Sequence, residues 1–349
     1  MDQQDKNKQD ETSGETTQTD LPFENLFLNR GFITGNNTIF AYLLVSVLTI
    51  TVYLLAPLVT LLPLVYMAQN AGIMNDIIID PYALLDFRKT GFDRNIPLAA
   101  TLMIYFITVL FFAFFLSKIQ TKSIRSVFTG YDRIRWKKFW FSFGIWSLLL
   151  VLSFILEYLI NPARYSSISE ITSQVSKTGG LVQTPTSYLV GLLITFLLLV
   201  VFLPFQTGFE ELFFRGYIVQ GISPATGGGF IPLIISSLLF GGAHMMNPEV
   251  DAYGIPVMLT YYSVFGFFMG AVALLDEGLE LAWGIHLANN LISSLLVTSG
   301  SSVIKTYALF EEKTSNLYYE MASWAICALI TFFIFKKKYR WHNFRLLYK

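Results

Sequence analysis

The chain of 349 residues is 54% hydrophobic and 16% aromatic, and only 14% of its residues are charged. This composition excludes an ordinary soluble domain and is typical of a polytopic membrane protein. The formal net charge of zero argues against a nucleic-acid partner, and the single cysteine, Cys327, excludes an internal disulfide and a cysteine-based metal cluster.

Residues 1–24 form a polar segment with almost no large apolar side chains. Such a segment cannot bury enough apolar surface to fold, so we predict a disordered tail. It has neither the basic start nor the apolar centre of a signal peptide, and no cleavage is expected.

Eight apolar segments follow, and each is close to the roughly 20 residues that a membrane-spanning helix needs. They cover residues 39–67, 97–117, 139–160, 187–208, 229–247, 255–275, 281–298 and 319–335. The fifth and seventh are interrupted by Gly, His or Asn, and the first contains Pro57 and Pro63, which are expected to kink it. We therefore predict an all-α fold, a polytopic transmembrane helical bundle with about eight spans.

The distribution of basic residues predicts the orientation. Sixteen of the 24 lysines and arginines lie at the N-terminus, between the second and third segments, or at the C-terminus. Basic residues near the ends of spans mark the cytoplasmic side. An even number of spans places all three regions on that side, so we expect a multi-pass protein of a bacterial cell membrane, with both termini cytoplasmic.

Two longer connections are placed on the other side of the membrane. Residues 68–96 mix apolar and charged side chains and are expected to lie along the membrane interface. Residues 161–186 are rich in Ser, Thr and Gly and are predicted to form a flexible loop.

Three ionisable side chains, Glu210, Glu211 and Arg215, interrupt the apolar run that follows the fourth segment. Each such residue costs about 2.5–3.5 kcal/mol at the centre of a bilayer, so these residues are rare and usually paired or functional. In a helix, Glu211 and Arg215 lie four residues apart on one face and are expected to form an ion pair. Glu210 projects about 100° away and has no partner within the motif, so its carboxylate is available for chemistry.

Two further polar clusters interrupt the fifth and seventh segments. They are Phe240-Gly241-Gly242-Ala243-His244 and His286-Leu287-Ala288-Asn289-Asn290. His286 and Asn290 share one helix face, and the small residues 241–243 would let another backbone or a substrate come close.

Glu210 and His244 can meet only if Glu210 lies inside the membrane. A fourth span that ended at Gly208 would leave the two residues on opposite membrane faces. We therefore predict that the helix bearing Glu210 continues to about Gln220, with a break or kink at Pro204.

In order and composition, the motifs Glu-Glu-x-x-x-Arg at 210–215, Phe-x-x-x-His at 240–244 and His-x-x-x-Asn at 286–290 resemble those of the CPBP family. This family, also called Abi, comprises CAAX-processing intramembrane proteases and bacteriocin-processing or bacteriocin-immunity proteins. The resemblance covers about residues 187–300, a four-helix catalytic core. The expected organisation is a tail at 1–24, an N-terminal membrane region at 25–186, the core at 187–300, and a last span with a basic tail at 301–349.

The resemblance implies a hydrolase, an intramembrane endopeptidase that cleaves a membrane-anchored, prenylated or leader peptide. Glu210 and His244 would activate the attacking water, and His286 and Asn290 would stabilise the oxyanion. Glu211 and Arg215 would hold the helix that presents Glu210. The chemistry agrees, because a buried carboxylate suits a general base and side-chain donors suit a developing oxyanion.

Two alternatives stay open. Glu210, His244 and His286 could instead bind zinc, although the chain lacks the His-Glu-x-x-His helix that usually presents such ligands; we expect no required cofactor. A non-enzymatic immunity protein or proton-coupled membrane protein could also use intramembrane Glu and His. Asn290 favours the enzyme, because a proton path has little use for a neutral amide beside His286.

Overall fold

The computed structural model of the protein describes residues 22–75, 84, 90–177, 184–299, 302, 305–314 and 316–348. The predicted disordered tail lies outside these residues apart from 22–24. Residues 76–83 and 85–89 of the predicted interfacial connection also lie outside them.

Six of the described helices or continuous helical runs are long and apolar enough to cross a membrane, which confirms the all-α, polytopic class. They are α2 with α3 (Ile39–Thr60 and Leu62–Asn70), α6 (Asn95–Ile119), α8 (Trp136–Ile160), the run of α10, η4 and α11 (Pro185–Glu210, Glu211–Ile218 and Val219–Thr226), α14 (Ile255–Asp276) and α16 (Leu317–Tyr339).

The predicted count of eight spans is corrected in the fifth and seventh segments. These segments form α12 (Phe230–Ala243, 14 residues) and α15 (Glu280–Leu296, 17 residues). At 1.5 Å per residue, they are about 21 and 26 Å long, shorter than the roughly 30 Å hydrocarbon core of a bilayer. Most of the side chains of α15 are buried, and the helix packs against α8, α10 and α14. Glu280 and His286 on this helix are therefore surrounded by protein rather than lipid.

The first predicted segment is two helices rather than one kinked helix. α2 ends at Thr60 and α3 begins at Leu62, with Pro57 inside α2 and Pro63 in the first turn of α3. Proline lacks the backbone N–H that a continuous helix would use, and this accounts for the break between the two.

The prediction of a flexible loop at 161–186 is wrong for residues 161–177, and residues 178–183 lie outside the described part. The chain forms the 3₁₀ turn η3 (Pro162–Arg164), strand β1 (Tyr165–Ser167) and helix α9 (Ile168–Lys177). β1 pairs antiparallel with β3 (Phe310–Glu312), which also pairs parallel with β2 (Val297–Ser299). Strands of three residues are too short to show an alternating pattern, so the sequence did not reveal this sheet.

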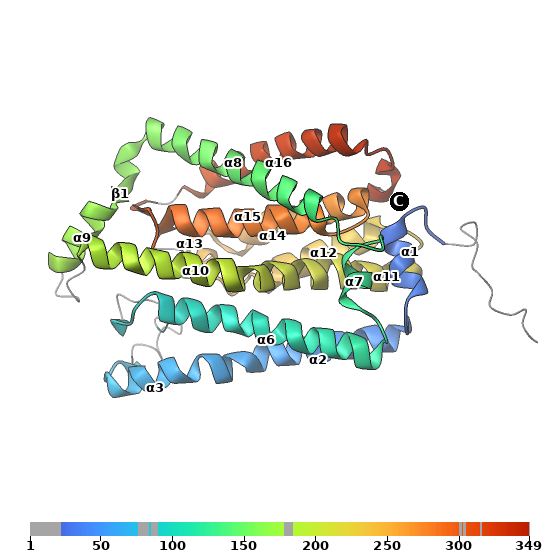
Figure 1. Ribbon diagram of the computed structural model, residues 1–349, viewed down its shortest axis with the longest axis horizontal. Coiled ribbons are helices and arrows are strands. Elements are labelled where there is room, and N and C mark those ends of the chain that lie inside the picture. Colours follow the sequence, from blue (N-terminus) through green and yellow to red (C-terminus); the bar gives the residue numbers. More distant parts are fainter. Residues whose placement is uncertain are drawn as a thin grey trace, which may run out of the picture.

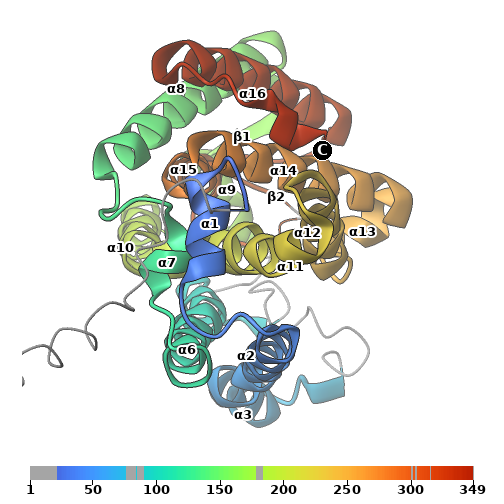
Figure 2. The same cartoon turned by 90° about the vertical axis from the view of Figure 1, so that its right-hand side faces the viewer.

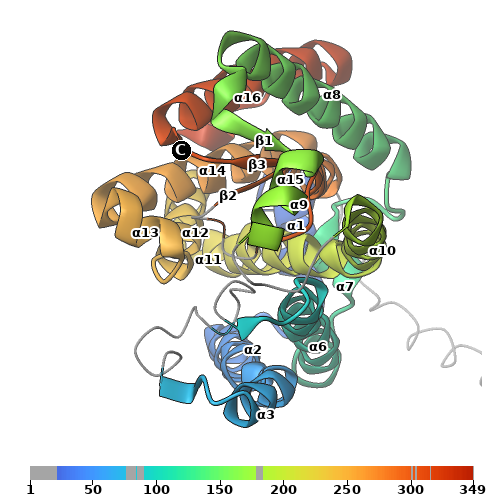
Figure 3. The ribbon, with the colours of Figure 1, turned by 90° about the vertical axis from the view of Figure 1, so that its left-hand side faces the viewer.

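The helices are arranged in packed layers (Figure 1). α2 and α6 pair with each other, and α6 packs on α10. α10 in turn contacts α15, while α12 pairs with α14 (Figure 2). The small sheet lies at the end of the molecule from which α9 projects (Figure 3).

The first and last described segments of the chain lie close together, which is consistent with an even number of spans. The side chain of Asn343, just before the 3₁₀ turn η5 (Phe344–Leu347), donates from Nδ2 to the carbonyl of Glu24 at 3.2 Å. Glu24 precedes the short helix α1 (Leu26–Ile33). The assignment of this end to the cytoplasm stays a prediction.

An ionic cluster at the same end fixes α15 against α8. Arg135, just before α8, pairs with Asp276 at 3.0 Å and bonds to Glu280 through its Nε at 3.0 Å. Lys138 pairs with Asp276 at 2.6 Å. These contacts join the start of α8 to the turn between α14 and α15, so they set the position of the helix that carries His286 and Asn290.

Glycine brings α8 and α15 into close contact further along. A Cβ at Gly284 would overlap the Ser142 hydroxyl and the Phe139 carbonyl of α8. Gly144, on α8 itself, has open space where a Cβ would be added. Both glycines lie inside helices, but only Gly284 has a close neighbour, so Gly144 serves as the control for a change from glycine to alanine.

We expect Gly284→Ala to destabilise the protein by about 1–3 kcal/mol, because overpacking forces the helices apart. Gly144→Ala is expected to leave stability unchanged or to raise it, because alanine favours helix over glycine. Thermal unfolding of both variants in detergent micelles measures the difference. Equal melting temperatures would contradict the close contact of α8 and α15.

Candidate functional site

Glu210 and Glu211 lie at a change of helix type. α10 ends at Glu210, and the chain continues without a break as the π-helix η4 and then as α11, to Thr226. This confirms that the helix bearing Glu210 passes Gln220. Pro204 lies inside α10, so the expected break does not occur there.

The π-helix η4 is a feature that the sequence did not predict. π-Helical turns are rare and occur mostly at functional sites, and no residue propensity marks them. The Ser236 hydroxyl of α12 donates to the Phe214 carbonyl within η4 at 2.7 Å. A side chain from a neighbouring helix thus satisfies a backbone acceptor of the irregular segment.

The predicted ion pair of Glu211 and Arg215 is confirmed. The Nη1 of Arg215 lies 3.2 Å from the Oε1 of Glu211, and both side chains are at most 1% exposed. The guanidinium also lies over the face of the Phe240 ring, 3.9 Å from its centroid. A buried charge is tolerated when it is paired, and here the cation has both a carboxylate and an aromatic face.

Glu211 has a second partner that the sequence did not indicate. Its Oε1 lies 2.7 Å from the Nδ1 of His286. Because a carboxylate only accepts hydrogen bonds, Nδ1 carries the proton of this bond. Glu211 therefore fixes the orientation of the His286 ring in addition to pairing with Arg215.

His286 also reaches Glu210. Its Nε2 lies 3.7 Å from the Oε2 of Glu210, whose side chain is 7% exposed. The Nε2 of Gln206, one helical turn earlier on α10, donates to the other Glu210 oxygen at 3.4 Å. Within the described residues, Glu210 makes, as expected, no hydrogen bond to Glu211 or Arg215 of its own motif. The neighbours of Glu210 are His286 on α15 and Gln206 on α10. The i,i+4 spacing of Gln206 and Glu210 could have identified Gln206 from the sequence.

His244 follows the last residue of α12. Its Nδ1 bonds to the Phe240 carbonyl at 2.8 Å, and its ring stacks on Tyr262 with 4.1 Å between centroids. A carbonyl only accepts, so Nδ1 carries the proton and the second ring nitrogen, Nε2, is left for other chemistry. The His244 ring also lies 4.4 Å from the Phe240 ring, which in turn is 6.4 Å from the ring of His286.

Asn290 lies one helical turn after His286 on α15 and is partly exposed. Its Oδ1 accepts from the Nδ2 of Asn289 at 3.2 Å. The Oδ1 of Asn289 in turn accepts from the Nε1 of Trp146 at 3.2 Å. Within the described residues, the Nδ2 group of Asn290 makes no hydrogen bond, so it can donate to a substrate.

The structure thus brings four of the six candidate residues into one connected group, namely Glu210, Glu211, Arg215 and His286. His244 is linked to this group through the Phe240 ring, which contacts the rings of both His244 and His286. Asn290 shares a helix with His286 and makes no hydrogen bond to the other candidates in the described part of the chain.

A zinc site finds limited support in this arrangement. The Nε2 atoms of His244 and His286 and the carboxylate of Glu210 are donor types that zinc accepts. Among the described residues, however, no three His, Cys, Asp or Glu side chains come close enough together to hold a metal ion. The residues as placed do not form a ready zinc shell.

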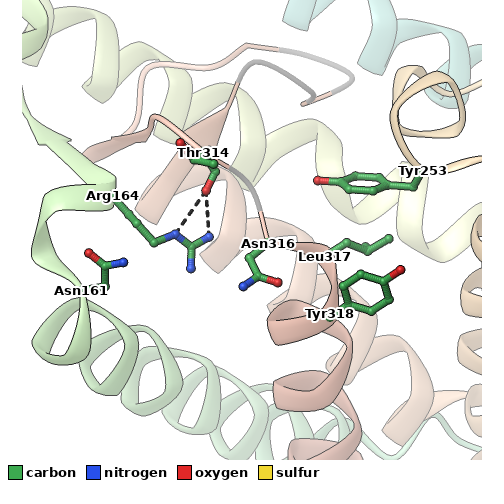
Figure 4. A pocket seen from close by; sticks show the side chains of 7 residues that line it. All are labelled: Asn161, Arg164, Tyr253, Thr314, Asn316, Leu317 and Tyr318. Carbon is green, nitrogen blue, oxygen red and sulfur yellow. Dashed lines mark hydrogen bonds between the residues drawn. The ribbon is translucent and has the colours of Figure 1, made fainter.

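A cavity of about 450 Å³ lies elsewhere in the molecule (Figure 4). It is lined by Asn161, Arg164, Tyr253, Thr314, Asn316, Leu317 and Tyr318, and contains none of the candidate residues. The Arg164 guanidinium beside it pairs with both Glu157 and Glu312 and bonds to the Thr314 carbonyl. These contacts satisfy the cation, so the cavity presents no free charge for a ligand.

A comparison with known protein families identifies the same region. Residues 189–292 match the family described as type II CAAX prenyl endopeptidase Rce1-like. This confirms the resemblance to the CPBP family over the segment that carries all three motifs, and it supports a CAAX-type intramembrane protease in general terms. The chain is also 26% identical over 272 residues to the uncharacterized protein YyaK of Bacillus subtilis (strain 168). The matched residues cover 78% of this chain and 82% of that protein. No solved structure matches the chain.

We expect Arg215→Met to reduce the stability of the protein by about 3–5 kcal/mol, because it leaves the buried Glu211 carboxylate without its cation. The double variant Glu211→Gln/Arg215→Met should recover part of this loss, since the amide of Gln removes the charge and its oxygen can still accept from His286. Unfolding in detergent micelles is measured for Arg215→Met, for Glu211→Gln and for the double variant. A loss of stability in the double variant equal to the sum of the two single losses would contradict a direct pair.

Proposed function

We propose that the Rce1-like region of this chain, residues 189–292, forms the catalytic core of an intramembrane endopeptidase. The observation that carries the proposal is the position of Glu210. Its buried carboxylate, on a continuous helical run, lies 3.7 Å from the Nε2 of His286. The Phe240 ring of the second motif lies 4.4 Å from the His244 ring and 6.4 Å from the His286 ring, which supports a common site for the three motifs.

In the proposed reaction, Glu210 and His244 bind the attacking water. Glu210 accepts a proton from this water while the water oxygen forms a bond to the carbonyl carbon of the substrate. The Nε2 of His244 accepts a hydrogen bond from the same water, because its Nδ1 is committed to the Phe240 carbonyl. The proton taken by Glu210 then passes to the leaving nitrogen as the C–N bond breaks, which yields a carboxylic acid and an amine; the acid then gives its proton to the amine or to water.

The oxyanion of the tetrahedral intermediate is stabilised by His286 and Asn290. Asn290 donates from its unpaired Nδ2 group. His286 donates from Nε2, and since its Nδ1 proton is held by Glu211, the ring must carry both protons for this role. The charges of Glu210, Glu211, Arg215 and a doubly protonated His286 then cancel, which suits a group buried in a medium of low polarity.

The proposed substrate is a peptide or protein held at the membrane. The matched family is described by its action on CAAX prenyl proteins, so a prenylated C-terminal peptide is the first substrate class, and a membrane-anchored leader peptide is the second. Two of the catalytic groups, His244 and Asn290, are partly exposed, whereas Glu210 and His286 are buried. A substrate backbone can therefore approach the site at His244 and at Asn290.

The mechanism proposed here uses no metal, since each catalytic atom already has a role in activating water or stabilising charge. Zinc held by Glu210, His244 and His286 would require these side chains to move together. The two mechanisms make opposite predictions for a chelator.

We expect Glu210→Gln and His244→Ala each to lower kcat by about 10²–10⁴-fold, because each removes a group that binds and activates water. Cleavage of a farnesylated CAAX-type peptide and of its non-prenylated counterpart is measured in reconstituted vesicles. Glu170→Gln, an exposed carboxylate on α9, is the matched control and should cleave normally.

A strong chelator is expected to leave cleavage unchanged in the same vesicles. Loss of activity that zinc restores would overturn the metal-free mechanism. Full activity in both site variants would overturn the assignment of the site, and absence of cleavage of either peptide by the wild type would overturn the CAAX-type substrate.

We expect Asn290→Ala to lower kcat by about 10²–10³-fold with little change in KM, because an oxyanion donor acts mainly in the transition state. Asn289→Ala is the matched neighbour, and its smaller effect should reflect only the loss of a bond that orients Asn290. Steady-state kinetics with the farnesylated peptide separates the two. A larger loss in Asn289→Ala would show that Asn289 is the donor instead.

A further inference from the structure

Trp146 lies on α8, outside the matched residues 189–292 and outside all three motifs. Its side chain is fully buried, and its indole Nε1 donates to the Oδ1 of Asn289 on α15 at 3.2 Å. The rings of Phe268 on α14 and Trp324 on α16 pack against the indole, each at 6.3 Å between centroids. The N-terminal membrane region therefore places a well-packed hydrogen-bond donor beside the helix that carries Asn290.

Two successive hydrogen bonds connect Trp146 to Asn290. The Oδ1 of Asn289 accepts from Trp146, and the Nδ2 of Asn289 donates to the Oδ1 of Asn290, also at 3.2 Å. The Nδ2 of Asn290, the group assigned to the oxyanion, stands at the end of this chain of hydrogen bonds.

The direction of the chain of hydrogen bonds follows from its first member. An asparagine amide keeps nearly the same shape when its oxygen and nitrogen exchange places, so shape alone does not decide which end faces a substrate. An indole N–H can only donate, so Asn289 must turn its oxygen towards Trp146 and its nitrogen towards Asn290. Asn290 must then turn its oxygen towards Asn289, which directs its Nδ2 elsewhere. The single N–H of Trp146 thus selects the orientation in which Asn290 can donate to a substrate.

The packing of α8 on α15 keeps Trp146 next to Asn289. The two helices lie side by side (Figure 1), and Arg135 and Glu280 join them at their beginnings. Gly284 then lets α8 approach α15 closely, and Trp146 and Asn289 lie about one turn beyond that contact. The donor is therefore held by the same packing that sets the position of α15.

We propose that Trp146 is a positioning residue for Asn290, and that α8, through the chain Trp146–Asn289–Asn290, fixes the amide orientation needed at the oxyanion. The inference rests on the proposed function in one respect, the role of Asn290 as an oxyanion donor. The hydrogen bond from Trp146 to Asn289 can be tested without a substrate.

The test without substrate records the indole N–H resonances of the full-length protein, with isotope-labelled tryptophan, in detergent micelles. The Trp146 resonance is assigned by its absence in Trp146→Phe. We expect Asn289→Leu to shift this resonance, because the change removes the acceptor of the indole N–H. The resonance of the exposed Trp140, on the same helix, should not move. An unchanged Trp146 resonance would overturn the proposal whether or not the protein is a protease.

The kinetic test compares Trp146→Phe with Trp324→Phe, using the farnesylated CAAX-type peptide in reconstituted vesicles. The buried Nε1 of Trp324 makes no hydrogen bond within the described residues, so Trp324→Phe removes the same atoms without removing a bond. Trp146→Phe is expected to lower kcat about fivefold to fiftyfold with KM within about twofold, because a misoriented donor fails mainly in the transition state. Trp324→Phe should cleave like the wild type.

A double variant shows whether the effect passes through Asn290. In the Asn290→Ala background, Trp146→Phe should lower kcat no further, because the group that Trp146 orients is gone. A further loss as large as the one in the wild-type background would indicate a general effect on the fold and overturn the proposal.

The remaining outcomes separate the two proposals. Equal kcat for Trp146→Phe and Trp324→Phe would overturn the positioning role and leave the protease intact. A wild type that does not cleave, together with the expected shift of the Trp146 resonance in Asn289→Leu, would confirm the hydrogen bond and overturn the role of Asn290 at an oxyanion.

Discussion

The burial of charge in an apolar bundle is the constraint on which the site depends. Glu211 and Arg215 lose nearly all contact with solvent, and such ions are stable only when each has a partner of opposite charge or a hydrogen bond. Arg215 provides the first partner and His286 the second. Because these partners lie on different helices, the electrostatic requirement of one carboxylate also fixes the position of α15 relative to η4. Glu210 is then placed against His286 as a consequence.

The π-helix makes this geometry compatible with a long helical run. A regular α-helix would direct residues 210–215 by a uniform rotation of about 100° each. The wider turn of η4 changes the directions of Glu211 and Arg215 relative to Glu210, which still belongs to α10. The two neighbouring carboxylates lie against different atoms of one ring, Glu211 at the Nδ1 and Glu210 at the Nε2 of His286. The Ser236 hydroxyl stabilises the irregular segment by donating a hydrogen bond to the Phe214 carbonyl.

Much of the fold and part of the site could be predicted from the sequence. Apolar runs identify membrane helices, and the i,i+4 spacing of Glu211 and Arg215 identifies their pair, because both depend on neighbours in the chain. The bond from His286 to Glu211 joins residues 75 positions apart, and no local pattern encodes it. The number of spans was overestimated, because α12 and α15 are apolar but shorter than the hydrocarbon core of a bilayer. The role of each catalytic residue stays a prediction.

Gln206 shows why the motifs alone could not delimit the site. It lies one helical turn before Glu210, outside all three motifs, and its Nε2 donates to the Glu210 carboxylate at 3.4 Å. A carboxylate inside a membrane must find its donors within the protein, because lipid supplies none. The set of residues that holds the base is therefore larger than the set that makes up the motifs.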